Sequence, residues 1–79
     1  MQIVELNIKL PYKGRGKILS RLYSNVRGKI RDVHFFPPTA EGISEIRMEI
    51  VEDNVPRLLS ELRKIVKNGR ITFRILSEA

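Results

Sequence analysis

The residues with the clearest chemical potential lie in one short stretch, PYKGRGKILSRL, from Pro11 to Leu22. This stretch joins an apolar run with strand periodicity to an apolar run with helix periodicity. Between the two runs, cations alternate with glycines: Lys13, Gly14, Arg15, Gly16 and Lys17. The first turn of a helix prefers negative charge, because the helix dipole places partial positive charge there. The cations at this position therefore need an explanation.

Two interpretations of the basic loop remain open from the sequence. Unpaired backbone N–H groups at a helix start bind anions, and glycines let a ligand approach those groups closely. We therefore predict that the Gly14–Lys17 backbone binds a carboxylate or a phosphate. Alternatively, the cations are solvated members of a basic surface, since each opposes the helix dipole by only about 0.3–1 kcal/mol.

Length and charge set the class of protein. The 79 residues are enough for one small domain, residues 1–79, and too few for two. Lys and Arg number 15 against nine Asp and Glu, a net charge of +6 that suits polyanions or anionic metabolites as partners. Basic and acidic residues are interleaved, however, and a charge-rich surface is also typical of thermophilic proteins.

The sequence offers little for catalysis, metals or membranes. It has no cysteine and a single histidine, His34, which we expect on a sheet surface or at an interface. No carboxylate pair has a spacing that suggests shared acid and base roles. We therefore expect no catalytic residue, no metal and no cofactor. No apolar run approaches the roughly 20 residues of a membrane span, and Met1 leads directly into a strand pattern, so a cytoplasmic protein without membrane association is expected.

Hydrophobic periodicity predicts six elements. The expected strands cover residues 2–10, 29–38, 44–51 and 70–76, and the expected helices cover residues 16–26 and 52–69. In the second strand the core positions Ile30, Val33 and Phe35 break strict alternation, which predicts a bulge near Arg31 and Asp32. In the last strand we expect three buried side chains: Ile71, Phe73 and Ile75.

Turn and cap residues mark the expected ends of these elements. Gly28 suits the C-terminus of the first helix, and Gly42 suits a hairpin turn. Asp53 or Asn54 is expected to cap the second helix, and Gly69 is expected to end it.

The order strand, helix, strand, strand, helix, strand predicts an α+β fold, the ferredoxin-like βαββαβ sandwich. Both helices then cover one face of a four-stranded antiparallel sheet, and the other face is solvated or meets another molecule. On that open face the central strands present polar residues without an aromatic ring: Glu5, Asn7, Lys9, Glu45, Arg47 and Glu49. This composition disfavours RNA binding by base stacking on the sheet.

The segment GRGKILSRLYSNVRGKI, residues 14–30, resembles the opening of an ACT domain, a small regulatory module of amino-acid metabolism. Gly16 matches the glycine of the family's Pro-Gly loop, and Gly28 with Ile30 matches the entry to the second strand. The apolar stripe Ile18, Leu19 and Leu22 matches the family's first helix. The resemblance implies a ferredoxin-like fold, an amino-acid ligand beside the loop and pairing between domains.

The sequence departs from the ACT pattern just before Gly16. Arg15 stands where the family has proline, and Lys13 and Gly14 stand where an acidic residue is common. Among the site residues, Gly16 therefore carries over and the preceding positions do not. A basic loop favours the carboxylate end of a ligand, a different anion, or no small ligand.

Three functions follow from the sequence. The leading hypothesis is a non-enzymatic ACT-like module, at least a homodimer, that senses an amino acid or other small anion or regulates a partner enzyme or regulator. The second is a small nucleic-acid-binding protein that uses basic residues of the first loop and helix: Lys13, Arg15, Lys17, Arg21 and Arg27. The third is a purely structural subunit of an assembly.

Overall fold

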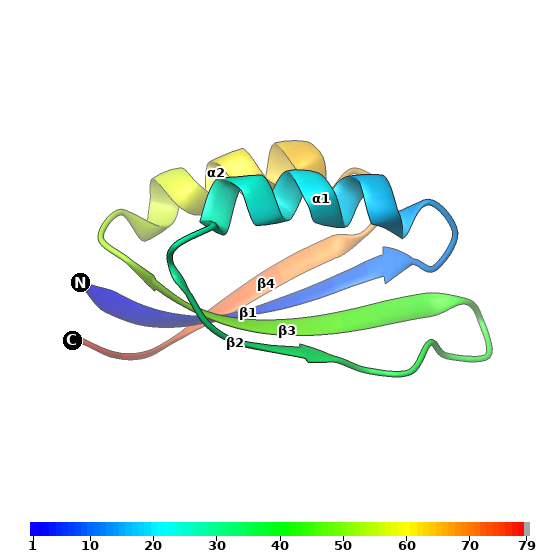
Figure 1. Ribbon diagram of the computed structural model, residues 1–79, viewed down its shortest axis with the longest axis horizontal. Helices are drawn as coiled ribbons and strands as arrows, with labels where there is room; N and C mark the ends of the chain where they lie inside the picture. The colour runs from blue at the N-terminus through cyan, green and yellow to red at the C-terminus, as the bar shows by residue number, and fades with distance from the viewer. Residues whose placement is uncertain (79) are drawn as a thin grey trace.

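A computed structural model describes residues 1–78, which form strands and helices in the predicted order (Figure 1). The elements are β1 (Gln2–Pro11), α1 (Arg15–Val26), β2 (Ile30–Phe35), β3 (Ile43–Glu52), α2 (Val55–Ile65) and β4 (Arg70–Glu78). Neither helix within residues 1–78 is long and apolar enough to cross a membrane.

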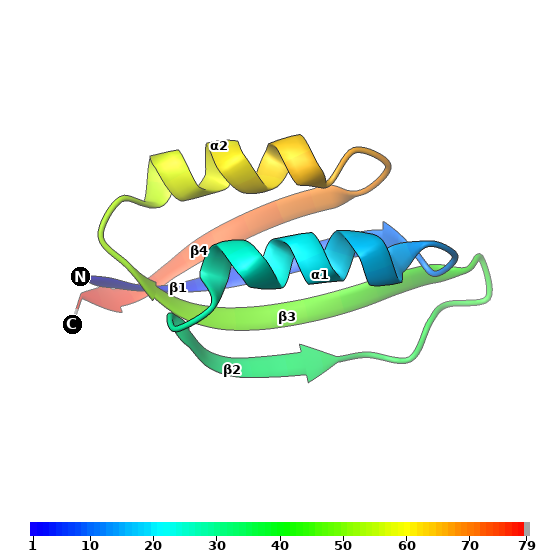
Figure 2. The same ribbon diagram turned by 45° about the horizontal axis from the view of Figure 1, so that its top comes forward.

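Over the described residues the strands form one antiparallel sheet of four, in the order β2-β3-β1-β4. Both helices lie on the same face of this sheet, as Figures 1 and 2 show from two directions. This arrangement is the predicted ferredoxin-like α+β sandwich, so the fold prediction is confirmed.

The core lies between the helices and the two central strands. Alternate residues of β1 and β3 point into it, and the register places Leu6 opposite Met48 and Ile8 opposite Ile46. Helix α2 supplies the broader apolar stripe, and its buried residues are Val55, Leu58, Leu59, Leu62 and Ile65. Helix α1 buries Leu22 and Val26 fully. The period-2 and period-3.6 patterns therefore identified this part of the core correctly.

Three side chains predicted to be buried are exposed instead. The exposed fractions are 62% for Phe35, 44% for Phe73 and 46% for Ile75. All three lie on β2 or β4, the edge strands of the sheet. An edge strand has a neighbouring strand on one side only, so the outer flank of its side chains has no strand beside it over the described residues. The prediction of burial was wrong because periodicity assigns a side chain to a face without showing whether that face is covered.

The predicted turn, bulge and cap residues are confirmed with one exception. Gly28 and Gly42 adopt positive φ angles of 86° and 80°, and the β2–β3 register shifts between Ile30 and Asp32. Asn54 caps α2, where its Oδ1 accepts a hydrogen bond from the Arg57 amide at 3.2 Å.

The exception is Gly69, which does not end a helix. Helix α2 ends at Ile65, and Gly69 lies instead against the end of β1. A Cβ atom at this position would overlap the Lys9 carbonyl oxygen and lie 2.9 Å from Leu10 Cδ2. Glycine is thus required here for the close approach of two backbone segments.

Candidate functional site

The basic loop joins β1 to α1 and is anchored on the turn between β2 and β3. The Tyr12 amide donates a hydrogen bond to the Gly42 carbonyl at 2.8 Å, and the Arg15 amide donates to the Tyr12 carbonyl at 3.4 Å. Helix α1 begins at Arg15, one residue earlier than predicted. The loop therefore has a defined backbone conformation, although its sequence is polar and rich in glycine.

The first turn of α1 has no side-chain cap among the residues that the structure describes. The N-cap residue is Gly14, which adopts a left-handed φ of 79°. Gly14, Gly16 and Lys17 are exposed, and a Cβ atom placed on either glycine would meet no atom within 4 Å. Because the Arg15 amide already donates to Tyr12, the N–H groups that this turn offers to a ligand are those of Gly16 and Lys17, as anion binding at a helix start requires.

Arg15 differs from the other loop cations because its side chain is already engaged. Its Nη1 donates a hydrogen bond to Ser44 Oγ at 2.9 Å, and its Cζ lies 4.4 Å from the Tyr12 ring centroid. Ser44 is fully buried on β3, opposite Leu10. The guanidinium therefore links the loop to the sheet, and this bridging position is what the structure adds to the predicted role of Arg15.

Sequence reasoning missed Tyr12 and Ser44 as parts of this loop. A signal for Ser44 was present, because it is the polar member of the alternate series Ser44, Ile46, Met48 and Ile50. A polar side chain in the phase that faces the core usually needs a hydrogen-bond partner. That partner, Arg15, could not be identified without the tertiary fold.

Replacing Arg15 with methionine is expected to lower the free energy of unfolding by about 1–3 kcal/mol, because it leaves the buried Ser44 hydroxyl without its donor. The same replacement of Lys17, an exposed neighbour, is expected to change it by less than about 0.5 kcal/mol. Urea denaturation of the two variants measures this difference. Equal stabilities would contradict the bridging role of Arg15.

The remaining cations of the loop, Lys13 and Lys17, are exposed. Their positions place exposed positive charge next to the N–H groups of Gly16 and Lys17. The five residues predicted as the site thus lie on one short segment. Four of them are exposed and one, Arg15, supports the segment from inside.

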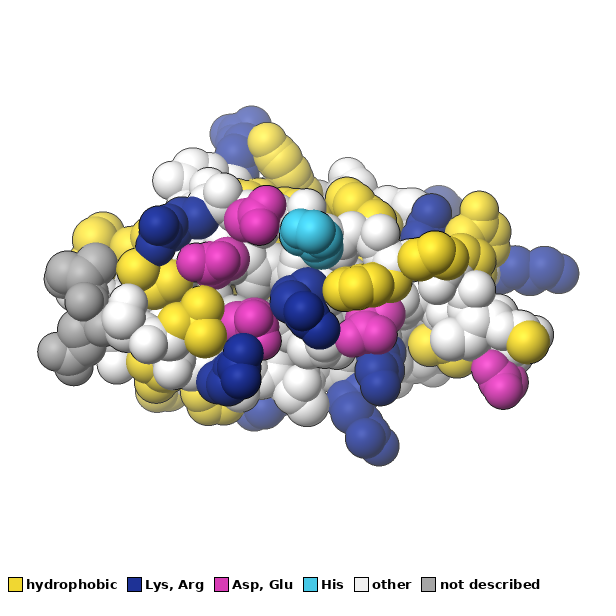
Figure 3. All heavy atoms as spheres, turned by 90° about the horizontal axis from the view of Figure 1, so that it is seen from below, with side chains coloured by type: hydrophobic (Ala, Val, Ile, Leu, Met, Phe, Trp, Pro, Cys, Tyr) yellow, Lys and Arg dark blue, Asp and Glu magenta, His cyan; other side chains and the backbone are white. Residues whose placement is uncertain are grey.

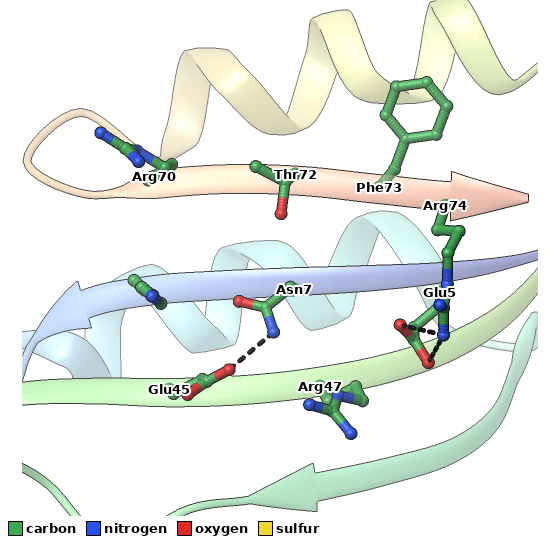
Figure 4. Close-up of a pocket in the computed structure, with 9 residues that line it drawn as sticks. Glu5, Asn7, Glu45, Arg47, Arg70, Thr72, Phe73 and Arg74 are labelled. Carbon is green, nitrogen blue, oxygen red and sulfur yellow. Dashed lines mark hydrogen bonds and ion pairs between the residues drawn. The ribbon is translucent and has the colours of Figure 1, made fainter.

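The open face of the sheet carries a second polar feature, a groove of about 490 Å³. Figure 3 shows basic and acidic side chains interspersed on this face around the histidine. Two pairs of side chains from neighbouring strands form hydrogen bonds within the groove (Figure 4). Asn7 Nδ2 donates to Glu45 Oε2 at 2.7 Å, and Arg74 Nη2 donates to Glu5 Oε1 at 3.2 Å. One of these pairs, Arg74 with Glu5, is an ion pair, and the lining also includes Lys9, Arg47 and Arg70.

His34 lies on the open face, as predicted. It is exposed, and its Nε2 lies 3.9 Å from Asp32 Oδ2. Among residues 1–78, no group of three His, Asp or Glu side chains is arranged to hold a metal ion.

Fold and loop together define a small ferredoxin-like module with an uncapped, basic helix start. No protein-family model matches the sequence, and no curated protein matches it. The structure is similar to an uncharacterized protein from Thermotoga maritima, with a TM-score of 0.78 and 16% identity over 96% of this chain and 98% of that one.

Two further solved structures share the fold. A formyltetrahydrofolate deformylase from Pseudomonas putida matches with a TM-score of 0.68 and 16% identity over 96% of this chain, which spans only 29% of the deformylase. A de novo designed protein matches with a TM-score of 0.64 and 22% identity, covering 98% of this chain and 97% of the design. At these identities the likeness establishes the fold alone.

Proposed function

We propose that residues 1–79 form one ACT-like regulatory domain that binds a small anionic metabolite at the loop Lys13, Gly14, Arg15, Gly16 and Lys17. The observation that carries this proposal is the helix start of α1, which lacks a side-chain cap among the described residues and has open space beside both glycines. The module acts in the cytoplasm without catalysis of its own, through an oligomeric interface or a partner enzyme or regulator.

The comparisons support a regulatory module through the contexts in which the fold occurs. The same fold makes up almost all of the Thermotoga maritima protein and a minor part of the Pseudomonas putida deformylase. A unit that occurs both nearly alone and within a larger enzyme chain suits a role in controlling other proteins. The resemblance of residues 14–30 to an ACT domain supports the same role independently.

The charge of the loop specifies the class of ligand. Unpaired N–H groups and the two exposed ammonium groups of Lys13 and Lys17 stabilise a carboxylate or a phosphate, and the loop itself offers no acidic side chain to an amino group. Among amino acids, those with a second carboxylate should therefore bind more tightly than neutral ones.

A thermal-shift screen over the amino acids, citrate and inorganic phosphate tests the proposal. A ligand at 100 times its Kd stabilises the folded state by about 2.7 kcal/mol, which should raise the Tm of a domain of this size by roughly 10 °C or more.

The control for this screen is a matched pair of double variants. Replacing Lys13 and Lys17 with serine should abolish the shift, while replacing the exposed Lys64 and Lys67 of the α2 region should preserve it. If none of these compounds raises the Tm, or if both double variants lose the shift equally, the loop is not the ligand site.

Nucleic-acid binding is the second candidate function, and the exposure of four basic residues favours it: Lys13, Lys17, Arg21 and Arg27. Binding to phosphates would make the affinity fall steeply with salt, with a slope that reports the number of contacts. The affinity for a small metabolite held by two cations would depend much less on the salt concentration.

A further inference from the structure

Strand β4 presents a long, unpaired backbone edge. It extends over nine residues, pairs with β1 on one side, and has no strand on its other side within residues 1–78. The opposite edge, β2, has six residues and a bulge between Ile30 and Asp32. Short length and bulges protect an edge from further pairing. The β4 edge has a bulge only near its end, at Leu76, where the β1–β4 register shifts, and residues 70–75 before it pair with β1 in unbroken register.

An apolar groove runs beside the β4 edge. Phe73 and Ile75 of β4 line it together with Val55, Pro56 and Leu59 of α2, and it encloses about 520 Å³. Figure 4 shows Phe73 directed toward the helix layer, away from Glu5 and Arg74 on the open face. Nearly half of the Phe73 and Ile75 surface remains exposed in the single chain. Large apolar side chains gathered at one exposed site are typical of an interaction surface.

We propose that this edge pairs with the same edge of a second copy of the chain, in antiparallel fashion, about a two-fold axis at Phe73. This proposal rests on the proposed function for the presence of an oligomer, and it names the surface through which the oligomer forms. The residues that support it lie on β4 and α2, outside the ligand loop. The two sheets then form one continuous sheet with all helices on the same side. The unpaired N–H and C=O groups of both β4 strands gain partners, as in other cases of strand addition.

The side-chain pattern of β4 selects this register. With Phe73 on the axis, Phe73 faces its symmetry mate and Ile71 faces Ile75, so every apolar residue of the helix-side face meets another apolar residue. The two apolar grooves then adjoin, and the Phe73 rings occupy the space between the two copies of α2.

Charge excludes the neighbouring registers. A two-fold axis at Thr72 would place Arg70 of one copy opposite Arg74 of the other. An axis at Arg74 would place the two Arg74 side chains opposite each other. Both arrangements bring like charges together and are repulsive. With the axis at Phe73, Arg74 lies opposite Thr72 instead. Its guanidinium also remains paired with Glu5 of its own chain at 3.2 Å.

A cysteine cross-link tests both the interface and the register, because the chain has no cysteine of its own. In the Phe73→Cys variant, the two cysteines would lie directly opposite each other, with Cα atoms about 4.5–5.5 Å apart, which a disulfide can bridge. In the control variant Thr72→Cys, the two cysteines would lie diagonally, beyond the roughly 7 Å limit for a disulfide. We expect a covalent dimer from the first variant under mild oxidation and little from the second.

Light scattering of the cysteine-free chain provides the second measurement. The expected mass is twice the 9.2 kDa of one chain. The Phe73→Glu variant should have the mass of one chain, while the Phe35→Glu variant, changed on the other edge strand, should keep the mass of the dimer.

A monomeric parent chain at 100 micromolar, a dimer unaffected by Phe73→Glu, or equal cross-linking at positions 72 and 73 would overturn the proposal. If Phe73→Glu does not fold, amide exchange of the unmodified chain decides, since pairing should protect alternate β4 amides that a monomer leaves exposed. The thermal-shift screen can fail while this dimer is present, so the two proposals fail separately.

Discussion

The Gly69→Ala variant is expected to lose about 1–3 kcal/mol of folding free energy, the range found when extra atoms are forced into a packed site. The added methyl group would overlap the Lys9 carbonyl oxygen and press on Leu10 Cδ2. Strands β1 and β4 are held together by a ladder that begins at the pair Lys9 and Arg70, directly next to Gly69, so neither backbone can yield easily. Urea denaturation monitored by circular dichroism measures the loss.

Gly16→Ala is the matched control for this prediction. Gly16 lies within α1 and has open space around its Cα, so alanine there should leave stability unchanged or raise it by about 0.5 kcal/mol. A similar loss at both positions would show that the tight packing at Gly69 is not the cause.

Truncation of Leu62 to alanine is expected to cost about 2–5 kcal/mol, enough to leave a domain of this size barely folded. Leu62 is 1% exposed and lies on the buried stripe of α2 that packs on the sheet. Phe35→Ala removes more atoms, yet it should cost less than about 1 kcal/mol because the Phe35 ring is mostly in water. Comparable losses for the two variants would mean that the β2 edge is covered in solution.

The contrast between Leu62 and Phe35 shows what the sequence could reveal about the fold. The periodicities of β1, β3 and α2 identified their buried faces, because these elements lie at the centre of the sandwich and every inward residue is covered. For β2 and β4 the same reasoning assigned the correct face to Phe35 and Phe73 but not their exposure. Exposure depends on strand order, which alternation does not encode.

The loop shows a similar division between local and tertiary information. Its position, its glycines and its cations follow from local sequence, since a strand pattern ends and a helix pattern begins there. The hydrogen bond from Arg15 to Ser44 joins residues 29 positions apart and depends on β3 lying beside β1. For the same reason the requirement for glycine at position 69 became evident only from its contact with Lys9.

The most direct test of the central claim is to follow the backbone amide resonances during titration with inorganic phosphate, glutamate or the best compound of the thermal-shift screen. Binding at the helix start predicts saturable shifts of the Gly14, Gly16 and Lys17 amides, with the Gly28 amide at the other end of α1 as an unshifted reference. If the Gly14 and Gly16 amides do not move at concentrations that stabilise the protein, the loop does not bind the anion and the proposed function is contradicted.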